Sequence, residues 1–347
     1  MLFEASQYHR MLNMDLNQIS RFIGENGYEE IKELGRTQSG ITLIEEALSR
    51  NLARTYRNVL NATPGSLQYL MKRFLSKGDI DNVLAIMRGK EFHIPSSQIQ
   101  KILLPGGTLS LEKLNQLLSL HDNHEVIQNL VDWEYYPLLA DKILIPYQKG
   151  SFADLENTLY RHYYERNYAL GKSRIRIWNS ILPYIRYEID IINLKNMFRI
   201  KAGSRVEDIR PYIIPGGNIQ SSAIQDVFTT QDKEHFVKFV KEAKIQIIFS
   251  QVLEDLNCDP VSCELDTVDQ IWKRWYERKV PLFLVMVGIN RVRLHHIDSL
   301  ARRYPFSVLP ILSYLENKRY EVTNLRAIAR GRQFEQDPEE IKKYLVM

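Results

Sequence analysis

The sequence predicts an all-α protein built from three similar helical units. Two observations predict it. A polar motif recurs three times at similar spacing, and each copy lies on an apolar stripe with the period of a helix. Composition agrees, because Gly and Pro account for only 16 and 13 of the 347 residues and alternating strand patterns are scarce. The apolar fraction of 44% supplies enough side chains for packed cores.

The motif is an acidic residue, an Asn three positions later, and an Arg six positions after the Asn, with another basic residue two positions beyond. Its members are Asp79, Asn82 and Arg88 in the first copy, Asp190, Asn193 and Arg199 in the second, and Glu321, Asn324 and Arg330 in the third. An Asn beside an apolar stripe needs hydrogen-bond partners for its amide. We expect a backbone carbonyl or a carboxylate at a helix junction to supply them.

Further landmarks repeat with nearly the same offset. Pro-Gly-Gly occurs at 105–107 and again at 215–217, where it should end a helix and turn the chain. Upstream, Ile44-Glu45 matches Leu155-Glu156, and Val268-Asp269 is a weaker third copy. The repeat predicts helical units at 1–118, 119–229 and 230–347.

The apolar stripes have helical spacing. In the first copy Ile80, Val83, Leu84 and Met87 recur at i, i+3, i+4 and i+7. The longest apolar run is Val280 to Ile289; within it Leu282 to Val287 could be an isolated strand, but a buried helix is favoured. Its ten residues are too few for a membrane span, which needs about 20. The N-terminus has no signal-peptide pattern, so we expect a protein without a transmembrane span.

A catalytic apparatus normally appears once per active site, whereas this motif appears three times. We therefore interpret its acid, Asn and Arg as structural residues and assign no catalytic, cofactor-binding or metal-binding residue. Pro-Gly-Gly lacks the spacing of a phosphate-binding loop. The adjacent His295 and His296 diverge on a helix and do not form a metal pair.

Charge and cysteine usage exclude other classes. The formal net charge of +4 is small for a nucleic-acid binder, and the basic aromatic stretch Trp272 to Lys279 is interpreted as an amphipathic helix. Nucleic-acid binding or catalysis by that stretch is a weaker alternative. Cys258 and Cys263 form neither a disulfide framework nor a zinc pattern, so we expect reduced thiols in a cytosolic compartment.

The terminal stretch from Tyr320 to Arg332 and the middle copy from Tyr187 to Leu194 resemble the C subunits of archaeal A-type ATP synthases, which are relatives of the d subunits of vacuolar-type ATPases. The resemblance covers essentially the whole chain. It implies a funnel of three helical domains with pseudo-threefold symmetry.

In that family one end of the funnel sits on the membrane ring of proteolipid subunits and the other receives the central stalk. The resemblance implies a peripheral subunit on the cytoplasmic side of the membrane that transmits torque in a proton- or sodium-translocating complex. It implies no catalysis, no cofactor and no nucleic-acid partner. The alternative is a helical-repeat scaffold that binds a protein outside a rotary ATPase, although solenoid repeats are usually only about 20–50 residues long.

Overall fold

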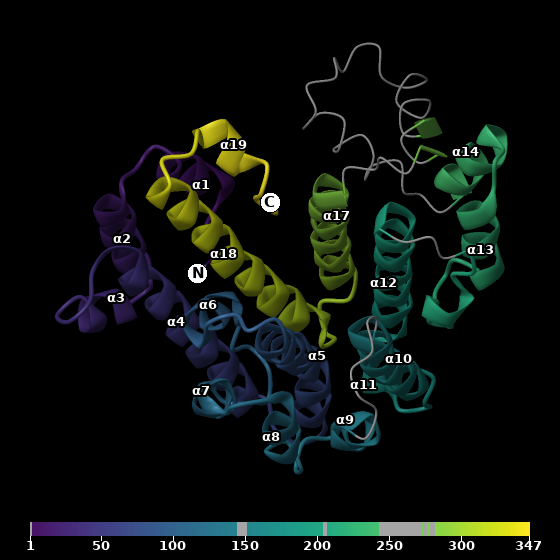
Figure 1. Ribbon diagram of the computed structural model, residues 1–347, viewed down its shortest axis with the longest axis horizontal. Helices are drawn as coiled ribbons and strands as arrows, with labels where there is room; N and C mark the ends of the chain where they lie inside the picture. The colour runs from purple at the N-terminus through teal and green to yellow at the C-terminus, as the bar shows by residue number, and fades with distance from the viewer. Residues whose placement is uncertain (1, 144–150, 204–206, 243–271, 274–275, 278–281) are drawn as a thin grey trace. The chain divides into compact units, whose positions relative to one another are not determined.

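The computed structural model describes residues 2–143, 151–203, 207–242, 272–273, 276–277 and 282–347. Every regular element in these residues is a helix, which confirms the predicted all-α class (Figure 1). None of the described helices combines the length and the apolar character that a membrane crossing requires.

The chain folds into two compact units, each assembled from two separate stretches of sequence. The first unit comprises Met1–Tyr163 and Leu315–Pro338, and the second comprises Tyr164–Tyr314 and Glu339–Met347. A helix near the C-terminus therefore belongs to the same unit as the N-terminal segment. The division into three sequence repeats remains a prediction.

The first unit consists of helices α1 to α9 and parts of two longer helices. They are α1 (Ala5–Met11), α2 (Leu16–Glu25), α3 (Glu30–Leu34), α4 (Gly40–Ala62), α5 (Gly65–Glu91), α6 (Ser96–Ile102), α7 (Leu111–Ser119), α8 (Asn123–Gln128), α9 (Tyr136–Ile143), the first part of α10 (Ser151–Gly171) and most of α18 (Leu309–Gln333). The long helices α4, α5 and α18 carry the motif and its upstream landmark.

Helix α5 buries the stripe that the sequence predicts. Ile80, Val83 and Met87 are fully buried, and Leu84 nearly so. Helix α18 buries the matching side chains of the third copy, so each helix presents its polar motif residues beside a packed apolar face.

Helices α5 and α18 end in the same way. After α5 the backbone N–H of Ile94 donates to the carbonyl of Gly89 at 2.8 Å, and His93 has a φ of 53°. After α18 the N–H of Gln336 donates to the carbonyl of Gly331 at 2.9 Å, and Glu335 has the same φ. A left-handed residue that turns the chain back onto the last helical turn satisfies carbonyls that the helix leaves open.

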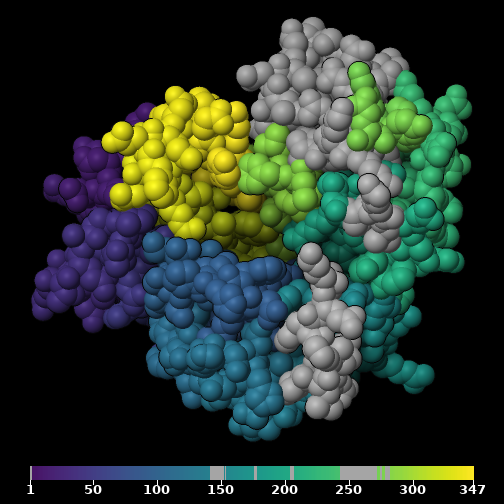
Figure 2. All heavy atoms as spheres, in the orientation of Figure 1, coloured from purple at the N-terminus to yellow at the C-terminus, as the bar shows by residue number. Residues whose placement is uncertain are grey.

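The first Pro-Gly-Gly turn lies between the short helices α6 and α7, in the blue part of the chain in the space-filling view (Figure 2). Helix α7 begins at an N-cap, because the side chain of Ser110 accepts a hydrogen bond from the N–H of Lys113 at 3.1 Å. Leu114 and Leu118 lie one turn apart on α7 and form a buried apolar stripe. The cap and the stripe hold α7 in place behind the turn.

The second unit has its own helices and its own core. They are the end of α10, α11 (Arg176–Asn179), α12 (Leu182–Gly203), the 3-10 helix η1 (Arg210–Tyr212), α13 (Ser221–Thr229), α14 (Lys233–Glu242), α17 (Leu282–Arg303), the start of α18 and most of α19 (Pro338–Lys342). Phe198, Phe228, Phe236 and Ile289 belong to this core. The apolar run that begins α17 is helical from Leu282 onward, which confirms the helix prediction for the described part of that run.

Helices α12 and α17 lie side by side and run antiparallel (Figure 1). The ammonium group of Lys195 donates to the side-chain oxygen of Asn290 at 2.7 Å. Further along, the ring of Tyr187 stacks on that of His296 with centroids 3.6 Å apart. The end of α17 therefore lies beside the start of α12.

Candidate functional site

The acid of the first copy holds the turn that follows Pro-Gly-Gly. Asp79 is fully buried on α5 and accepts hydrogen bonds from the N–H of Thr108 at 2.7 Å, the hydroxyl of Thr108 at 2.6 Å and the N–H of Leu109 at 2.9 Å. Burial raises the pKa of Asp79 to about 6, against the opposing effect of these three hydrogen bonds. One carboxylate thus fixes the chain immediately before α7.

The second copy repeats this arrangement on α12. Asp190 accepts from the N–H of Asn218 at 3.0 Å, the side-chain amide of Asn218 at 2.9 Å and the N–H of Ile219 at 2.9 Å. Burial raises the pKa of Asp190, while these hydrogen bonds lower it. Asp190 therefore fixes the turn before α13 in the same way as Asp79 fixes the turn before α7.

The last glycine of each Pro-Gly-Gly is required by this contact. A Cβ on Gly107 would collide with the carboxylate of Asp79, and a Cβ on Gly217 would collide with that of Asp190. In the second turn, Gly216 also has a φ of 106°, which favours glycine. The repeated acid and the repeated glycine are thus two halves of one junction.

In the first two copies the Asn both donates to and accepts from the backbone of the residue before Pro-Gly-Gly. Asn82 donates to the carbonyl of Leu104 at 2.9 Å and accepts from its N–H at 2.9 Å. Asn193 makes the same pair with Ile214, at 2.8 Å in both directions. Leu104 and Ile214 lie outside a helix, so the buried side-chain amide takes the place of the backbone partners that a helix would supply.

At the third copy the N-terminal segment takes the place that the Pro-Gly-Gly turn has in the other two. Glu321 accepts from the backbone N–H of Phe3 and from the Tyr28 hydroxyl, both at 2.6 Å. Its third partner is the ammonium group of Lys318, also at 2.6 Å. Asn324 forms a side-chain hydrogen bond with Tyr8. The start of the chain thus completes the junction made by its last long helix.

The register of the three junctions is the same. Leu109, Ile219 and Phe3 each donate a backbone N–H to the motif acid, and each lies two residues before a helix. Those helices are α7, α13 and α1. Helix α1 is therefore the structural counterpart of α7 and α13.

The final basic residue of each copy supports this equivalence. Lys90 donates to the carbonyl of Leu118 in α7 at 3.1 Å, and Lys201 donates to that of Phe228 in α13 at 2.8 Å. Arg332 donates to the carbonyl of Met14, just beyond α1, at 3.0 Å. A cation at the C-terminal end of a helix satisfies open carbonyls and complements the helix dipole.

The motif Arg bonds to the glutamate of the upstream landmark. Arg88 pairs with Glu156 of α10, and Arg330 pairs with Glu45 of α4 at 2.7 Å. Arg199, the motif Arg of the second copy, is exposed on α12. The acid that matches Glu45 and Glu156 in the third landmark is Asp269, which lies outside the described residues. Since Glu45 and Glu156 occupy matching places in the repeat, Arg88 and Arg330 each join their copy to the long helix of another.

A polar junction that the repeat does not predict lies where α5, α10 and α18 meet in the first unit. Asp81 accepts from the Tyr160 hydroxyl and pairs with Arg319. Burial would raise the pKa of Asp81, but the charges of Arg319 and Lys77 and the hydrogen bonds from Tyr160 and Arg319 lower it. Little in the sequence indicates this junction, because the residue matching Asp81 is Ile192 in the second copy.

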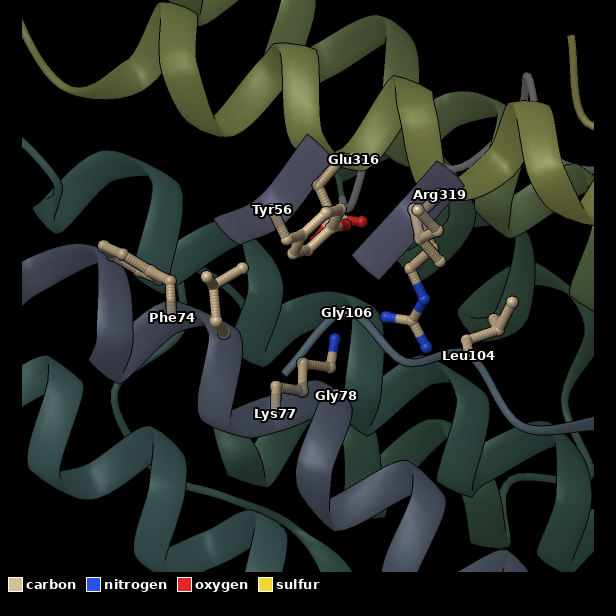
Figure 3. Close-up of a pocket in the computed structure, with 10 residues that line it drawn as sticks. Tyr56, Phe74, Lys77, Gly78, Leu104, Gly106, Glu316 and Arg319 are labelled. Carbon is tan, nitrogen blue, oxygen red and sulfur yellow. The ribbon is translucent and has the colours of Figure 1, made fainter. Parts of the chain in front are cut away.

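A small hollow lies beside this junction, between α5 and α18 (Figure 3). The side chains of Lys77 and Arg319 point into it from opposite walls, and Tyr56 and Gly106 also line it. The hollow is a cavity of about 20 Å³, which leaves room for a water molecule.

The other candidates from the sequence form no cluster in the described residues. No group of three or more His, Cys, Asp or Glu side chains there could hold a metal ion. His296 stacks on Tyr187, while His295 is exposed on α17. Trp272 packs against Phe236, as expected for an amphipathic helix. Much of the basic aromatic stretch and both cysteines lie outside the described residues.

Replacing Asn82 by leucine is expected to lower the free energy of unfolding by about 1–3 kcal/mol, because the N–H and C=O of Leu104 lose their partner. The same change at Asn193 should have an effect of the same size in the second unit. Urea denaturation followed by circular dichroism measures both. Asn115→Leu, on the exposed face of α7, is the control, and an equally small effect in all three variants would contradict the prediction.

The stability of the first unit should depend on pH through Asp79. Its pKa is about 6 when folded and about 3.9 when unfolded, so the folded state holds the extra proton between these values. This contribution is complete below about pH 4 and is lost as pH rises through 6. Between pH 5 and 7.5, the wild-type chain should lose about 1–2 kcal/mol relative to Asp79→Asn. Parallel stability curves for the two proteins would contradict this; Asp132→Asn, at an exposed position of the same unit, is the control.

Known proteins resemble this chain along its entire length. The family described as ATP synthase (C/AC39) subunit matches residues 1–344. The C subunit of the A-type ATP synthase from Methanococcoides burtonii is 31% identical over 100% of this chain and 90% of its own length. The proteins of the same name from Archaeoglobus fulgidus and Haloferax volcanii are 29% and 28% identical over 100% of this chain and 92% and 93% of their own lengths.

Proposed function

This chain belongs to the ATP synthase (C/AC39) subunit family, and we propose that it is the non-catalytic central-rotor subunit that connects the central stalk of a rotary ATP synthase to the membrane ring of proteolipid subunits. The full-length similarity to the C subunits of A-type ATP synthases carries the proposal. On this proposal the chain binds on the cytoplasmic side of the membrane and transmits torque between the ring and the stalk.

The junctions support a mechanical role. A torque-transmitting subunit must keep its helices in fixed register, and packed helices joined by buried hydrogen bonds deform little. Asp79, Asp190 and Glu321 each hold the chain ahead of a helix, and Arg88 and Arg330 each join two long helices. We propose that all nine motif residues serve this structural purpose and that none acts in catalysis.

We further propose that the chain consists of three units with pseudo-threefold symmetry. The equivalence of α1, α7 and α13 supports beginning each unit at one of these helices. Boundaries after residues 118 and 229 would instead leave α7 and α13 at the end of a unit. The N-terminal segment would then open the first unit and also complete the junction of the third.

Affinity isolation of the tagged full-length chain from its native membranes tests the proposed role. The proteolipid and central-stalk subunits should be recovered with it, and the purified chain should not hydrolyse ATP. The untagged strain is the control for non-specific recovery. Isolation of the chain without other ATP synthase subunits, or ATP turnover that follows the chain through purification, would overturn the proposal.

A further inference from the structure

One end of the second unit gathers exposed cations around exposed apolar side chains. The antiparallel packing of α12 and α17 brings the end of α17 beside the start of α12. Helix α11 precedes α12 by only two residues, and the amide of Asn179 bonds to the carbonyl of Gly171 at 3.2 Å, which ties α11 to the end of α10. The turn after α10 and the turn after α17 therefore share this end.

We name this surface the basic tip. It consists of Lys172, Arg174, Ile175, Arg302, Arg303 and Phe306, all of them exposed. Phe306 is fully exposed and Ile175 is 49% exposed. A single exposed apolar residue is ordinary on a protein surface, so the informative feature is that cations flank these two.

Few acidic residues lie near these cations in the sequence. The first acid after the α10 turn is Glu188, which is buried and paired with Arg293 at 2.5 Å. On α17 the last acid is Asp298, which accepts a hydrogen bond from Ser313. The basic tip therefore keeps a local excess of positive charge, whereas most charged stretches of the chain mix both signs.

The arrangement of the cations indicates the kind of partner. Arg302 and Arg303 are adjacent on a helix and diverge, and Lys172 and Arg174 lie on a different turn. Such charges spread over a surface and do not converge on a pocket, which fits a continuous layer of negative charge better than a single carboxylate. Phe306 follows Pro305 in the turn after α17 and is fully exposed, three residues beyond Arg303.

We propose that the basic tip binds the anionic phospholipid headgroups of the membrane surface. Lys and Arg side chains are attracted to anionic lipids, and an aromatic side chain among them can enter the boundary between headgroups and acyl chains. This inference rests on the proposed function, because that function places the chain next to a membrane. It adds a direct lipid contact to contacts with other subunits.

Vesicle co-sedimentation of the full chain tests this contact. Phosphatidylcholine vesicles with about 30 mol% phosphatidylglycerol should bind the chain, pure phosphatidylcholine should not, and binding should weaken as added salt screens the charges. Each cation near such a surface contributes a factor of about five. Replacing the four cations of the tip by glutamine should therefore lower vesicle affinity by about 100-fold or more, and Phe306→Ser by about three- to ten-fold.

Two matched controls separate position from overall charge. Replacing Arg21, Lys32, Lys238 and Lys241 by glutamine gives the same net charge but leaves the tip intact, and it should keep vesicle affinity within about two-fold because the tip charges act locally. Phe334→Ser removes another exposed phenylalanine, which lies near Glu335 and Asp337, and should have no effect. Circular dichroism checks that every variant is folded.

Equal vesicle affinity for the tip and control variants would overturn the proposal. So would a tip variant that binds vesicles normally but is no longer isolated with other ATP synthase subunits, since the tip would then contact an acidic protein. The proposed function is tested separately: it fails if affinity isolation of the wild-type chain does not recover other ATP synthase subunits.

Discussion

Replacing Glu321 by leucine is expected to lower the free energy of unfolding of the first unit by about 3–5 kcal/mol. The side chains of Glu321 and Lys318 are only 2% and 6% exposed, so the change leaves a buried ammonium group without its carboxylate. It also removes the acceptor of the Phe3 N–H and of the Tyr28 hydroxyl. Chemical denaturation gives the size of the effect, and faster hydrogen exchange in α1 and α18 would locate it in the first unit.

The double variant Glu321→Leu with Lys318→Met is the control for this prediction. It removes both charges, so it should recover a substantial part of the lost stability, although Phe3 and Tyr28 still lack their acceptor. If the single variant unfolds within about 0.5 kcal/mol of the wild-type chain, Glu321 does not close the junction as described.

The second large effect is expected at Arg293 in the second unit. Its guanidinium group pairs with Glu188 at 2.5 Å, and the two side chains are 4% and 3% exposed. Arg293→Met should cost about 3–5 kcal/mol, because the carboxylate of Glu188 keeps its burial but loses its counter-ion. Differential scanning calorimetry should show that this variant unfolds at a lower temperature than the wild-type chain.

Arg291→Met is the matched control, two residues away on the same helix. Arg291 is less buried and donates to the backbone carbonyl of Leu345 at 2.9 Å and 3.1 Å, so its loss should cost only about 1 kcal/mol. The double variant Glu188→Leu with Arg293→Met should be more stable than Arg293→Met alone. The opposite order would mean that the ion pair does not determine the effect.

The repeated junctions could be predicted in outline because each copy faces the same hydrogen-bonding problem. Asn82 and Asn193 stand beside apolar stripes, and a buried amide there requires a backbone partner. The sequence also contained the second half of the junction, since Pro-Gly-Gly recurs with nearly the same offset as the Asn. It did not reveal that Gly107 is required by the carboxylate of Asp79, because that requirement depends on a distance in space.

The closure of the third copy by the N-terminal segment could not be read from the sequence. Phe3 donates through its backbone, which any residue except proline could do, so its side chain gives no signal. The pairs Asp81–Arg319 and Glu188–Arg293 also escaped prediction, because they are not repeated and their partners are far apart in the chain. Sequence periodicity reveals contacts that recur, whereas contacts that occur only once can be identified only from the folded structure.

The bond between Phe3 and Glu321 has a consequence for synthesis of the chain. The two residues are 318 positions apart, so at about 5–20 residues per second the ribosome delivers the acceptor tens of seconds after the donor. Until then Phe3, Tyr8 and Tyr28 have no partner on α18. The first unit can therefore be completed only after α18 has been synthesised.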